Sequence, residues 1–552
     1  MKRFFIFIFF VMWPLGTAAA QLPDNMYFRA MNDEMQRALQ GLRLKDHPKP
    51  YFIAYWLSHH NSVTVRADMG TLAPAVHDPN NRGDSLVLEA FVSVGSDKQD
   101  GLGFADAKRG SWAYYNAQMP YGFPTASYDS IRQNLWKATD EAYLQAADLY
   151  KKKQAYKQKK NIQDPLPDVV PAPAGHFTQD IPPFVWPDVA RLEQQVKDWS
   201  ALGKKLPFLE SFNWELSIKQ MDWYYLNSRG AFSQYAIPSI RLDGRAVFRQ
   251  PDGKTSEVSV TWWLKDTATQ TLEQTTSKVE KFLSQIKQAH GASSGEAYVG
   301  PVLLKPAAAA RFVRNAVLFE FTNSKPWLLT YADDDEDAGL LFKKKHVRVS
   351  TDLLTVYDRP LARDFEGIPL YNFRPVDAEG VAAENLTLIE SGHVKDFPLT
   401  RRPLSKHHRS NGHAYIERVY GPREGLTNVF IEPKEQLSDE QMEEKLRQRC
   451  RELGLEYGYI LYKADPSDDL GIERLYTADG RKETVLNLKW DGNFFTQRDL
   501  RGVLAVGGQE ELVSNNGNSV LIAPSILMQE VELVPQEHQP HRKPFISKPK
   551  ID

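Results

Sequence analysis

One polar segment, RRPLSKHHRSNGHAY (401–415), gathers three histidines with several basic residues. Guanidinium groups bind carboxylates through paired hydrogen bonds, so its arginines are candidates for holding a peptide or another carboxylate. Asn411-Gly412 is also a strong turn dipeptide, and an ordinary surface turn is an equally good interpretation. The candidate substrate-binding residues of the segment are Arg401, Arg402, Arg409, Asn411, Gly412 and His413.

Three other groups of residues suggest chemistry less strongly. His59 and His60 are adjacent, and neighbouring side chains of a strand point to opposite faces, which disfavours a shared metal ion. The acidic run 333–337 lacks the glycine and the spacing of a calcium loop and is best interpreted as a solvated loop. Cys450, the single cysteine, lies on an apolar helical stripe, where burial makes a thiol inert.

A different stretch is notable for lacking chemistry. VGPVLLKPAAAARFVRNAVLFEF (299–321) passes from an apolar strand through a proline into an alanine-rich helix, without any His, Asp or Cys. It is either core or a site that has lost its functional side chains. Elsewhere the sequence contains no zinc-binding His/Cys spacing, no phosphate-binding loop and no nucleophile elbow.

The first 20 residues indicate export. A basic start at Lys2-Arg3, an apolar run too short to span a bilayer and small residues at 18–20 are typical of a cleaved signal peptide. Its removal leaves 66 basic and 70 acidic residues, a net charge of −4, which disfavours nucleic-acid binding. We therefore expect a periplasmic or secreted protein without a membrane span after cleavage.

Local patterns predict the elements that position these residues. Apolar residues at helical spacing predict helices over 31–42, 131–149, 189–199 and 272–286, and Ser438 with Gln441 predicts a capped helix ending at Gly454. KKKQAYKQKK (151–160) is expected to be the solvated end of the second helix. Extended stretches are expected at 51–57, 62–68, 85–95, 257–264 and on both sides of Ser228-Arg229-Gly230 and Ser391-Gly392.

These patterns predict an α+β fold in two domains. We expect a mixed α/β domain with long helices at 21–290, which includes a proline-rich connection at 165–187, where proline cannot donate to a helix or ladder. A mostly antiparallel, barrel-like β domain is expected at 291–534. Residues 535–552 are expected to form a loose tail.

Five segments in order resemble the TldD/PmbA family, also called modulator of DNA gyrase. The resembling segments are WYYLNSRGAFSQY, VDAEGVAAENLTLIESGHVKDFPLTRRP, SNGHAY, GLTNVFIEPKEQLSDEQMEEKL and NSVLIAPSILMQEVEL. Each is weak alone, but together they span most of the mature chain. The resemblance implies a peptidase-like C-terminal domain.

Active members of the family are similar to zinc proteases, with a His-Glu-x-x-x-His motif directly after a strand and a cysteine before a C-terminal Gly-Gln. Here the strand is 302–304, and the motif positions hold Lys305, Pro306 and Ala310, while LAVGGQ (504–509) has no cysteine. Ammonium, proline and alanine side chains offer no lone pair to zinc. The resemblance thus points to the PmbA-like (TldE-like) branch, and we expect no catalytic residue, no metal and no cofactor.

Three functions remain open at this point. The first is a catalytically silent subunit that binds peptides or unfolded proteins, as a homodimer or with a zinc-bearing relative. The second is an active peptidase that uses other residues, with Glu379, His407, His408 and His413 as candidates. The third is a purely structural exported subunit. The segments 300–320 and 401–415 are expected to border the cleft between the domains.

Overall fold

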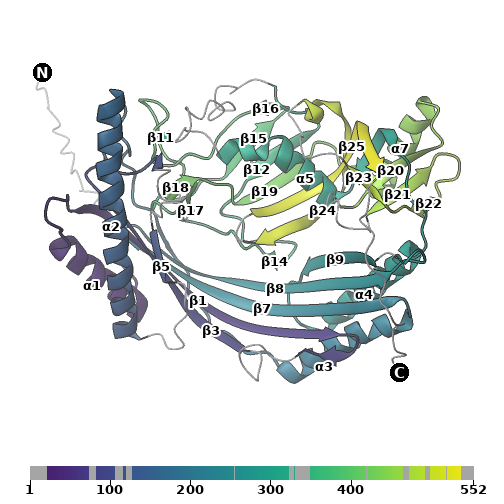
Figure 1. Cartoon of the computed structure of the whole chain (residues 1–552), viewed down its shortest axis with the longest axis horizontal. Coiled ribbons are helices and arrows are strands. Elements are labelled where there is room, and N and C mark those ends of the chain that lie inside the picture. Colours follow the sequence, from purple (N-terminus) through teal and green to yellow (C-terminus); the bar gives the residue numbers. More distant parts are fainter. Residues whose placement is uncertain are drawn as a thin grey trace, which may run out of the picture.

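The protein is described from a computed structural model. The structure describes residues 21–73, 82–105, 116–119, 127–163, 165–253, 255–322, 328–329, 348–417, 421–463, 471–490, 498–516 and 519–535. Two large sheets make up most of the β structure, and in Figure 1 the second sheet lies above the long strands of the first. The predicted signal peptide lies outside the described residues.

The N-terminal sheet has eight strands in the order β5-β3-β1-β7-β8-β6, with β2 on β1 and β9 on β8. The strands are β1 (Pro50–Asp68), β2 (Thr71–Leu72), β3 (Arg82–Val94), β5 (Asn116–Met119), β6 (His176–Thr178), β7 (Leu209–Asn227), β8 (Phe232–Arg249) and β9 (Thr255–Trp263).

Strand β1 corrects one prediction. The two extended stretches expected at 51–57 and 62–68 form one continuous strand, because β1 pairs along its middle with both β3 and β7. Its polar centre is satisfied by neighbours: His59 Nε2 lies 2.8 Å from Asp84 Oδ1, and His60 Nε2 lies 2.8 Å from Ser58 Oγ. Polarity alone therefore did not mark a break in the strand.

Four helices cover one face of this sheet: α1 (Met26–Gly41), α2 (Tyr128–Lys160), α3 (Val189–Ala201) and α4 (Thr269–Ala289). Alternate residues of β1 face these helices. Tyr55 belongs to the cluster formed with α1 and α2, and Val65 belongs to the cluster formed with α3 and α4. On the opposite face, Trp56 packs with Tyr225 and with Ala378 of the C-terminal half.

Helix α2 corrects a second prediction. The lysine-rich stretch 151–160 is helical, as expected, but it is not simply a solvated end, because Lys153 is buried. Its ammonium lies 2.8 Å from Asp168 Oδ1 and donates to the Leu102 carbonyl. Both partners lie outside the helix, Leu102 51 residues before Lys153 and Asp168 in the proline-rich connection, so the composition of the helix did not reveal them.

The C-terminal sheet has eleven strands on the open path β16-β15-β12-β19-β25-β10-β20-β21-β22, with β23 and β24 also paired to β25. The strands are β10 (Tyr298–Leu304), β12 (Leu354–Asp358), β15 (Leu386–Glu390), β16 (His393–Val394), β19 (Asn428–Pro433), β20 (Tyr457–Leu461), β21 (Ile472–Tyr476), β22 (Lys482–Thr484), β23 (Leu488–Trp490), β24 (Val503–Asn516) and β25 (Ser519–Pro535). The predicted α+β class with a β-rich C-terminal part is confirmed, although the described strands do not close into a barrel.

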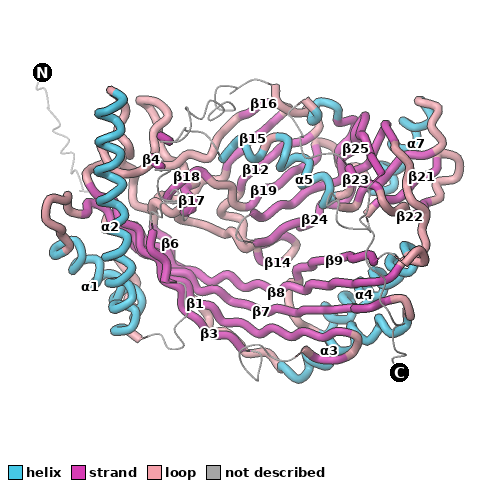
Figure 2. Tube along the Cα trace, viewed as in Figure 1, coloured by secondary structure: helices cyan, strands magenta, loops and turns pink. Residues whose placement is uncertain are grey.

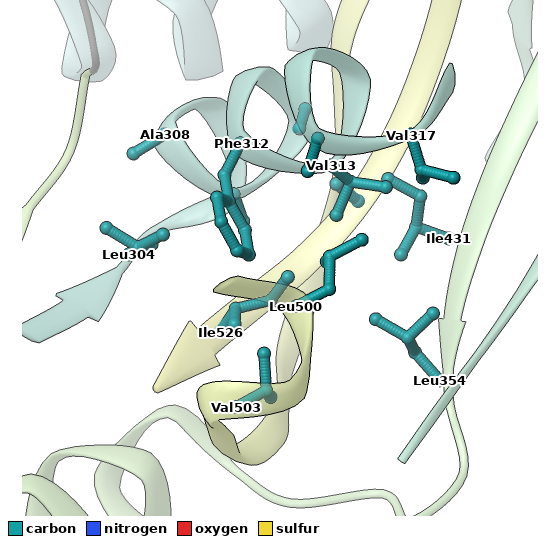
Figure 3. Close-up of a cluster of buried hydrophobic side chains, with 14 of the residues drawn as sticks. Leu304, Ala308, Phe312, Val313, Val317, Leu354, Ile431, Leu500, Val503 and Ile526 are labelled. Carbon is teal, nitrogen blue, oxygen red and sulfur yellow. The ribbon is translucent and has the colours of Figure 1, made fainter. Parts of the chain in front are cut away.

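Helices lie on both faces of this sheet: α5 (Pro306–Ala316) on one and α7 (Asp439–Glu452) on the other. In β10, Leu304 packs in the cluster beneath α5, whereas Leu303 packs against α7. Figure 3 shows Phe312 and Val313 of α5 in the first cluster. Hydrophobic burial on the two faces thus fixes the strand-to-helix junction between β10 and α5.

Short elements complete the fold (Figure 2). They are β4 (Phe104–Ala105) paired with β11 (Leu328–Leu329), β13 (Asp364–Phe365) with β14 (Ile368–Pro369), β17 (Ala414–Glu417) with β18 (Gly421–Glu424), and the 3-10 helices 202–205, 318–322 and 499–502. The proline-rich connection is irregular except at β6, which pairs parallel with β8. No helix among the described residues is long and apolar enough to cross a membrane.

Candidate functional site

The junction between β10 and α5 is tightly fixed by backbone geometry. The Lys305 N–H donates to the Leu461 carbonyl at 2.8 Å, and its extended backbone precedes the helix. Pro306 occupies the first helical position, where a missing N–H costs nothing and the ring presets φ. Lys305 is therefore held at the point where the strand ends and the helix begins.

The Lys305 ammonium is engaged by two carboxylates of α7. Nζ lies 2.8 Å from Asp439 Oδ1 and 3.8 Å from Glu443 Oε1, and the Lys305 side chain is only 12% exposed. Asp439 stands in the first turn of α7, where the helix dipole favours an anion. The cation at position 305 is thus paired within the chain.

The segment 504–509 meets the same ion pair. The Gly508 N–H donates to the Leu437 carbonyl at 2.8 Å, with Gly508 at φ +79°. A Cβ on Gly508 would lie 2.7 Å from Asp439 Oδ1, and one on Gly507 would lie 2.7 Å from Leu437 Cβ. The structure therefore brings together two distant stretches, 305–310 and 504–509, and leaves little room for a side chain in the second.

The arginines of 401–415 have different environments. Arg401 is buried, and its Nε donates to the Val170 carbonyl at 2.8 Å, while Arg402 is also buried and lies beside Gly103. Arg409 is exposed and forms a bidentate salt bridge with the Glu384 carboxylate. Of the three, Arg409 is the one whose guanidinium faces solvent.

Asn411, Gly412 and His413 are buried, as part of a turn rather than an open surface. Gly412 has φ +76°, and a Cβ there would collide with the Ala382 carbonyl, so the position requires glycine. His413 Nε2 lies 3.4 Å from Asp358 Oδ2, with both side chains fully buried. His408 is partly buried and its Nε2 lies 2.7 Å from the Thr400 carbonyl, whereas His407 is exposed.

The segment Asp377-Ala378-Glu379-Gly380 forms a turn against the hairpin that links β7 and β8. Asp377 accepts hydrogen bonds from the N–H groups of Glu379, Val381 and Ala414. Glu379 accepts the Arg401 N–H at 2.6 Å. Burial raises the pKa of both carboxyl groups, and the neighbouring Asp377 charge adds to the effect on Glu379, whose pKa rises to about 8. These groups form a buried junction between the two halves of the chain.

Comparison with known proteins identifies the C-terminal half. Residues 297–534 match the PmbA/TldA metallopeptidase C-terminal domain. Residues 297–534 therefore form a domain of the TldD/PmbA family.

Solved structures extend the likeness over the fold of the whole chain. TldE from Thermococcus kodakarensis superposes with a TM-score of 0.59 at 15% identity, over 92% of this chain and 100% of that one. A candidate modulator of DNA gyrase from Thermotoga maritima gives 0.58 at 12% identity, with coverage of 92% and 100%. One from Bacteroides thetaiotaomicron gives 0.57 at 12%, with 92% and 98%. At these identities the likeness shows the fold. No curated protein matches the chain.

The residues at the positions that the TldD/PmbA resemblance assigns to zinc do not fit the metal. Lys305 brings an ammonium already paired with Asp439, and Ala310 is fully buried in the apolar core beneath α5. Gly507 and Gly508 carry no donor side chain. Zinc requires lone-pair donors at tetrahedral distances, which none of these side chains can supply. These positions therefore do not form a zinc site.

Cys450 does not replace the missing thiolate. It lies on the buried side of α7 with Leu446, against Leu303 of β10. Burial raises the pKa of its thiol to about 11, so the thiolate that would attack a reagent or bind a metal is scarce near neutral pH.

We predict that Cys450 resists thiol reagents in the native protein. At pH 8, Ellman's reagent should release less than about 0.1 equivalent of chromophore from the folded chain, because the thiol is both buried and protonated. In guanidinium chloride about one equivalent should appear. Full reaction of the folded protein within minutes would contradict the inert assignment.

The remaining sequence candidates are separate from this region. His59 lies beside Asp84 and Asp222. The adjacent His60 is partly buried, and this burial lowers its pKa. The acidic run 333–337 lies outside the described residues. Among the residues that the structure describes, no group of three or more His, Cys, Asp and Glu side chains is placed to hold a metal ion.

One partner in the site was missed by sequence reasoning. Asp439 and Glu443 belong to the predicted α7 helix, and an acidic first turn explains Asp439 locally. Nothing in the local pattern indicates that it faces Lys305, which is 134 residues away.

Proposed function

We propose that this protein is an exported TldD/PmbA-family peptidase homologue without a zinc site of its own, acting as a peptide-binding or assembly subunit. The observation that carries the proposal is the Lys305–Asp439 ion pair at the end of β10. A cation supplied by the chain stands where the family resemblance calls for a metal ligand. The proposal thus places the protein in the PmbA-like (TldE-like) branch.

Electrostatics supports this interpretation. The ion pairs of Lys305 with Asp439 and Glu443 stabilise the junction only while the amine is protonated. A protonated amine has no lone pair for a metal. Binding zinc at position 305 would require loss of that proton and of the pair with Asp439. The same residues that stabilise the junction therefore oppose metal binding.

The alternative of an active peptidase that uses other residues receives less support. Two of its four candidates, Glu379 and His413, are 6% and 2% exposed and are held in the junction between the halves of the chain. A general base must reach the proton that it removes, within hydrogen-bonding distance of a bound substrate. Cleavage through these groups would need the junction to open first.

The decisive experiment measures zinc in protein that was purified from zinc-supplemented cells. We expect less than about 0.1 zinc per chain by plasma mass spectrometry, against the near-unit stoichiometry of a structural or catalytic site. About one tightly held zinc per chain would overturn the proposal. A parallel assay with a fluorescent unfolded peptide should give saturable binding without chelator-sensitive cleavage; absence of binding would remove the peptide-binding role.

Assembly is tested separately. Light scattering after size exclusion should give a homodimer, or a complex with a zinc-bearing family member when the two are co-expressed. Export is tested by N-terminal sequencing of the mature protein, which should begin after residue 20. A stable monomer that neither binds peptide nor pairs with a relative would favour the structural role.

A further inference from the structure

Strand β9 is an edge of the N-terminal sheet. Among the described residues it pairs only with β8, and this pairing is antiparallel. Just beyond β9, Leu264 N–H donates to the Ile240 carbonyl at 2.9 Å, in step with the pairing of Leu242 with Trp262. In an antiparallel ladder the hydrogen-bonded residues alternate, so the even-numbered residues of β9 bond to β8.

The odd-numbered residues therefore direct their backbone groups away from β8. Glu257, Ser259 and Thr261 are all exposed. Within the described part of the chain, no hydrogen bond occupies their N–H groups. The edge thus presents a row of outward N–H donors and carbonyl acceptors, which is a template for pairing with another strand.

One contact already uses this edge. Lys463, which follows β20 of the C-terminal sheet, donates its ammonium to the Ser259 carbonyl. This confirms that the carbonyl points outward, and it shows that the C-terminal half lies beside the edge. Figure 1 shows β9 between β8 and the C-terminal sheet.

We propose that the free edge of β9 binds an extended peptide by strand addition; the idea rests on the peptide-binding role proposed above. The peptide main chain would bond to the N–H groups of Glu257, Ser259 and Thr261 and to the outward carbonyls. Such pairing recognises any unfolded segment, because the backbone supplies the bonds and no particular side chain is required.

The position of Lys463 favours a peptide over a second copy of this chain. Edge-to-edge pairing of two sheets would bring a whole second sheet against the C-terminal half, from which Lys463 already reaches the edge. A single extended segment needs only to compete with that ammonium for the Ser259 carbonyl. A slender, unfolded partner is thus the occupant that this setting fits.

A polar hollow lies over β1, β7 and β8, on the face of the N-terminal sheet opposite to α3 and α4. Its volume is about 440 Å³, and its lining includes Arg66, Glu215 and Asp243. The charges are balanced within the hollow, since Arg66 pairs with Glu215 and Arg241 pairs with Asp243. An added strand would lie beyond β9, where the Glu257 carboxylate is already paired with Arg245, so we expect little preference between acidic and basic peptides.

The test removes the outward N–H groups one at a time. Ser259→Pro and Thr261→Pro each delete one edge donor, and proline is tolerated at an edge where the N–H faces solvent. We expect binding of a fluorescein-labelled eight-residue Thr/Val peptide to weaken roughly tenfold for each variant, because a peptide carbonyl loses its donor. Glu296→Pro, at an exposed loop position before β10, is the matched proline control and should bind normally.

A modified peptide supplies a test that does not depend on the variants' folding. N-methylation at every residue keeps the side chains but removes the donors along both peptide edges, and it should abolish binding to the unmodified protein. If wild-type protein binds the plain and methylated peptides equally, strand addition is wrong although peptide binding stands. Unchanged affinity of well-folded proline variants, or loss of dimer instead of peptide binding in light scattering, would also overturn it.

Discussion

Lys153→Ala should lower the free energy of unfolding by about 3–5 kcal/mol, the largest effect that we expect from a single substitution outside the core. The side chain is only 2% exposed. Its ammonium lies 2.8 Å from Asp168 Oδ1 and 3.8 Å from Asp100 Oδ1, and it donates to the Leu102 carbonyl. Removing it leaves Asp100 without its cation and leaves Asp168 with only Lys157, whose ammonium lies 3.8 Å from Oδ1.

The surrounding bonds explain why the structure cannot easily adjust. Asp168 accepts the Asp100 N–H at 2.9 Å, while Asp100 accepts the Tyr51 hydroxyl at 2.9 Å and the Leu102 N–H at 2.7 Å. Burial raises the pKa of Asp100 to about 6 despite the nearby ammonium. The network ties α2 to the loop after β3 and to the proline-rich connection.

Urea unfolding of the variants measures the effect. Lys159→Ala, on the exposed end of the same helix, is the matched control and should change the free energy of unfolding by less than about 0.5 kcal/mol. Lys153→Met keeps most of the stem and should be nearly as harmful as alanine, whereas adding Asp168→Asn should recover part of the loss. Equal midpoints for Lys153→Ala and Lys159→Ala would show that the buried network contributes little.

Replacing Glu379 with glutamine should flatten the dependence of stability on pH between about 4.5 and 8. The Glu379 carboxyl has a pKa of about 8 in the folded chain, against an ordinary value of 4.5. In this window the folded state holds a proton that the unfolded state has released. Stability therefore falls as pH rises, by about 5 kcal/mol across the whole window if Glu379 acts alone.

Burial is the main cause of this raised pKa, followed by the Asp377 charge, with Arg401 acting in the opposite direction. Asp377 accepts three backbone N–H groups and is the better site for the negative charge of the pair. Glutamine mimics the protonated Glu379 and can still accept the Arg401 N–H. The variant should therefore match the wild type near pH 5 and exceed its stability near pH 8.

The measurement is a series of urea unfolding curves at pH 5, 6, 7, 8 and 9. Glu384→Gln provides the control, because Glu384 is an exposed partner of Arg409 and should leave the pH profile nearly unchanged. Parallel profiles for wild type and Glu379→Gln would refute a protonated Glu379 at the junction.

Much of the fold could be predicted where the signal is local. Ser438 and Gln441 form the predicted capping box of α7, and Gly454 ends the helix at φ +69°. Ser391 and Gly392 both have positive φ in the predicted hairpin turn. Caps and turns involve residues a few positions apart, so residue type and spacing contain the information.

The site was predictable only in part, because its contacts join distant segments. The sequence placed Lys305, Pro306 and Ala310 at a strand-to-helix junction but could not reveal that Asp439 neutralises the lysine. It also grouped Arg401 and Arg409, whose environments differ: one is buried between the halves of the chain and the other is paired at the surface.

By itself, the sequence determined the composition of the degenerate junction, the periodicity of the helices and the turns that separate strands, since each depends on neighbours along the chain. Only the tertiary structure decided that Lys153 is buried, that 504–509 meets Lys305 through Asp439, and that β8 is the one strand paired with β9 among the described residues. Burial and ion pairing depend on which distant segments meet, and no local pattern encodes that meeting.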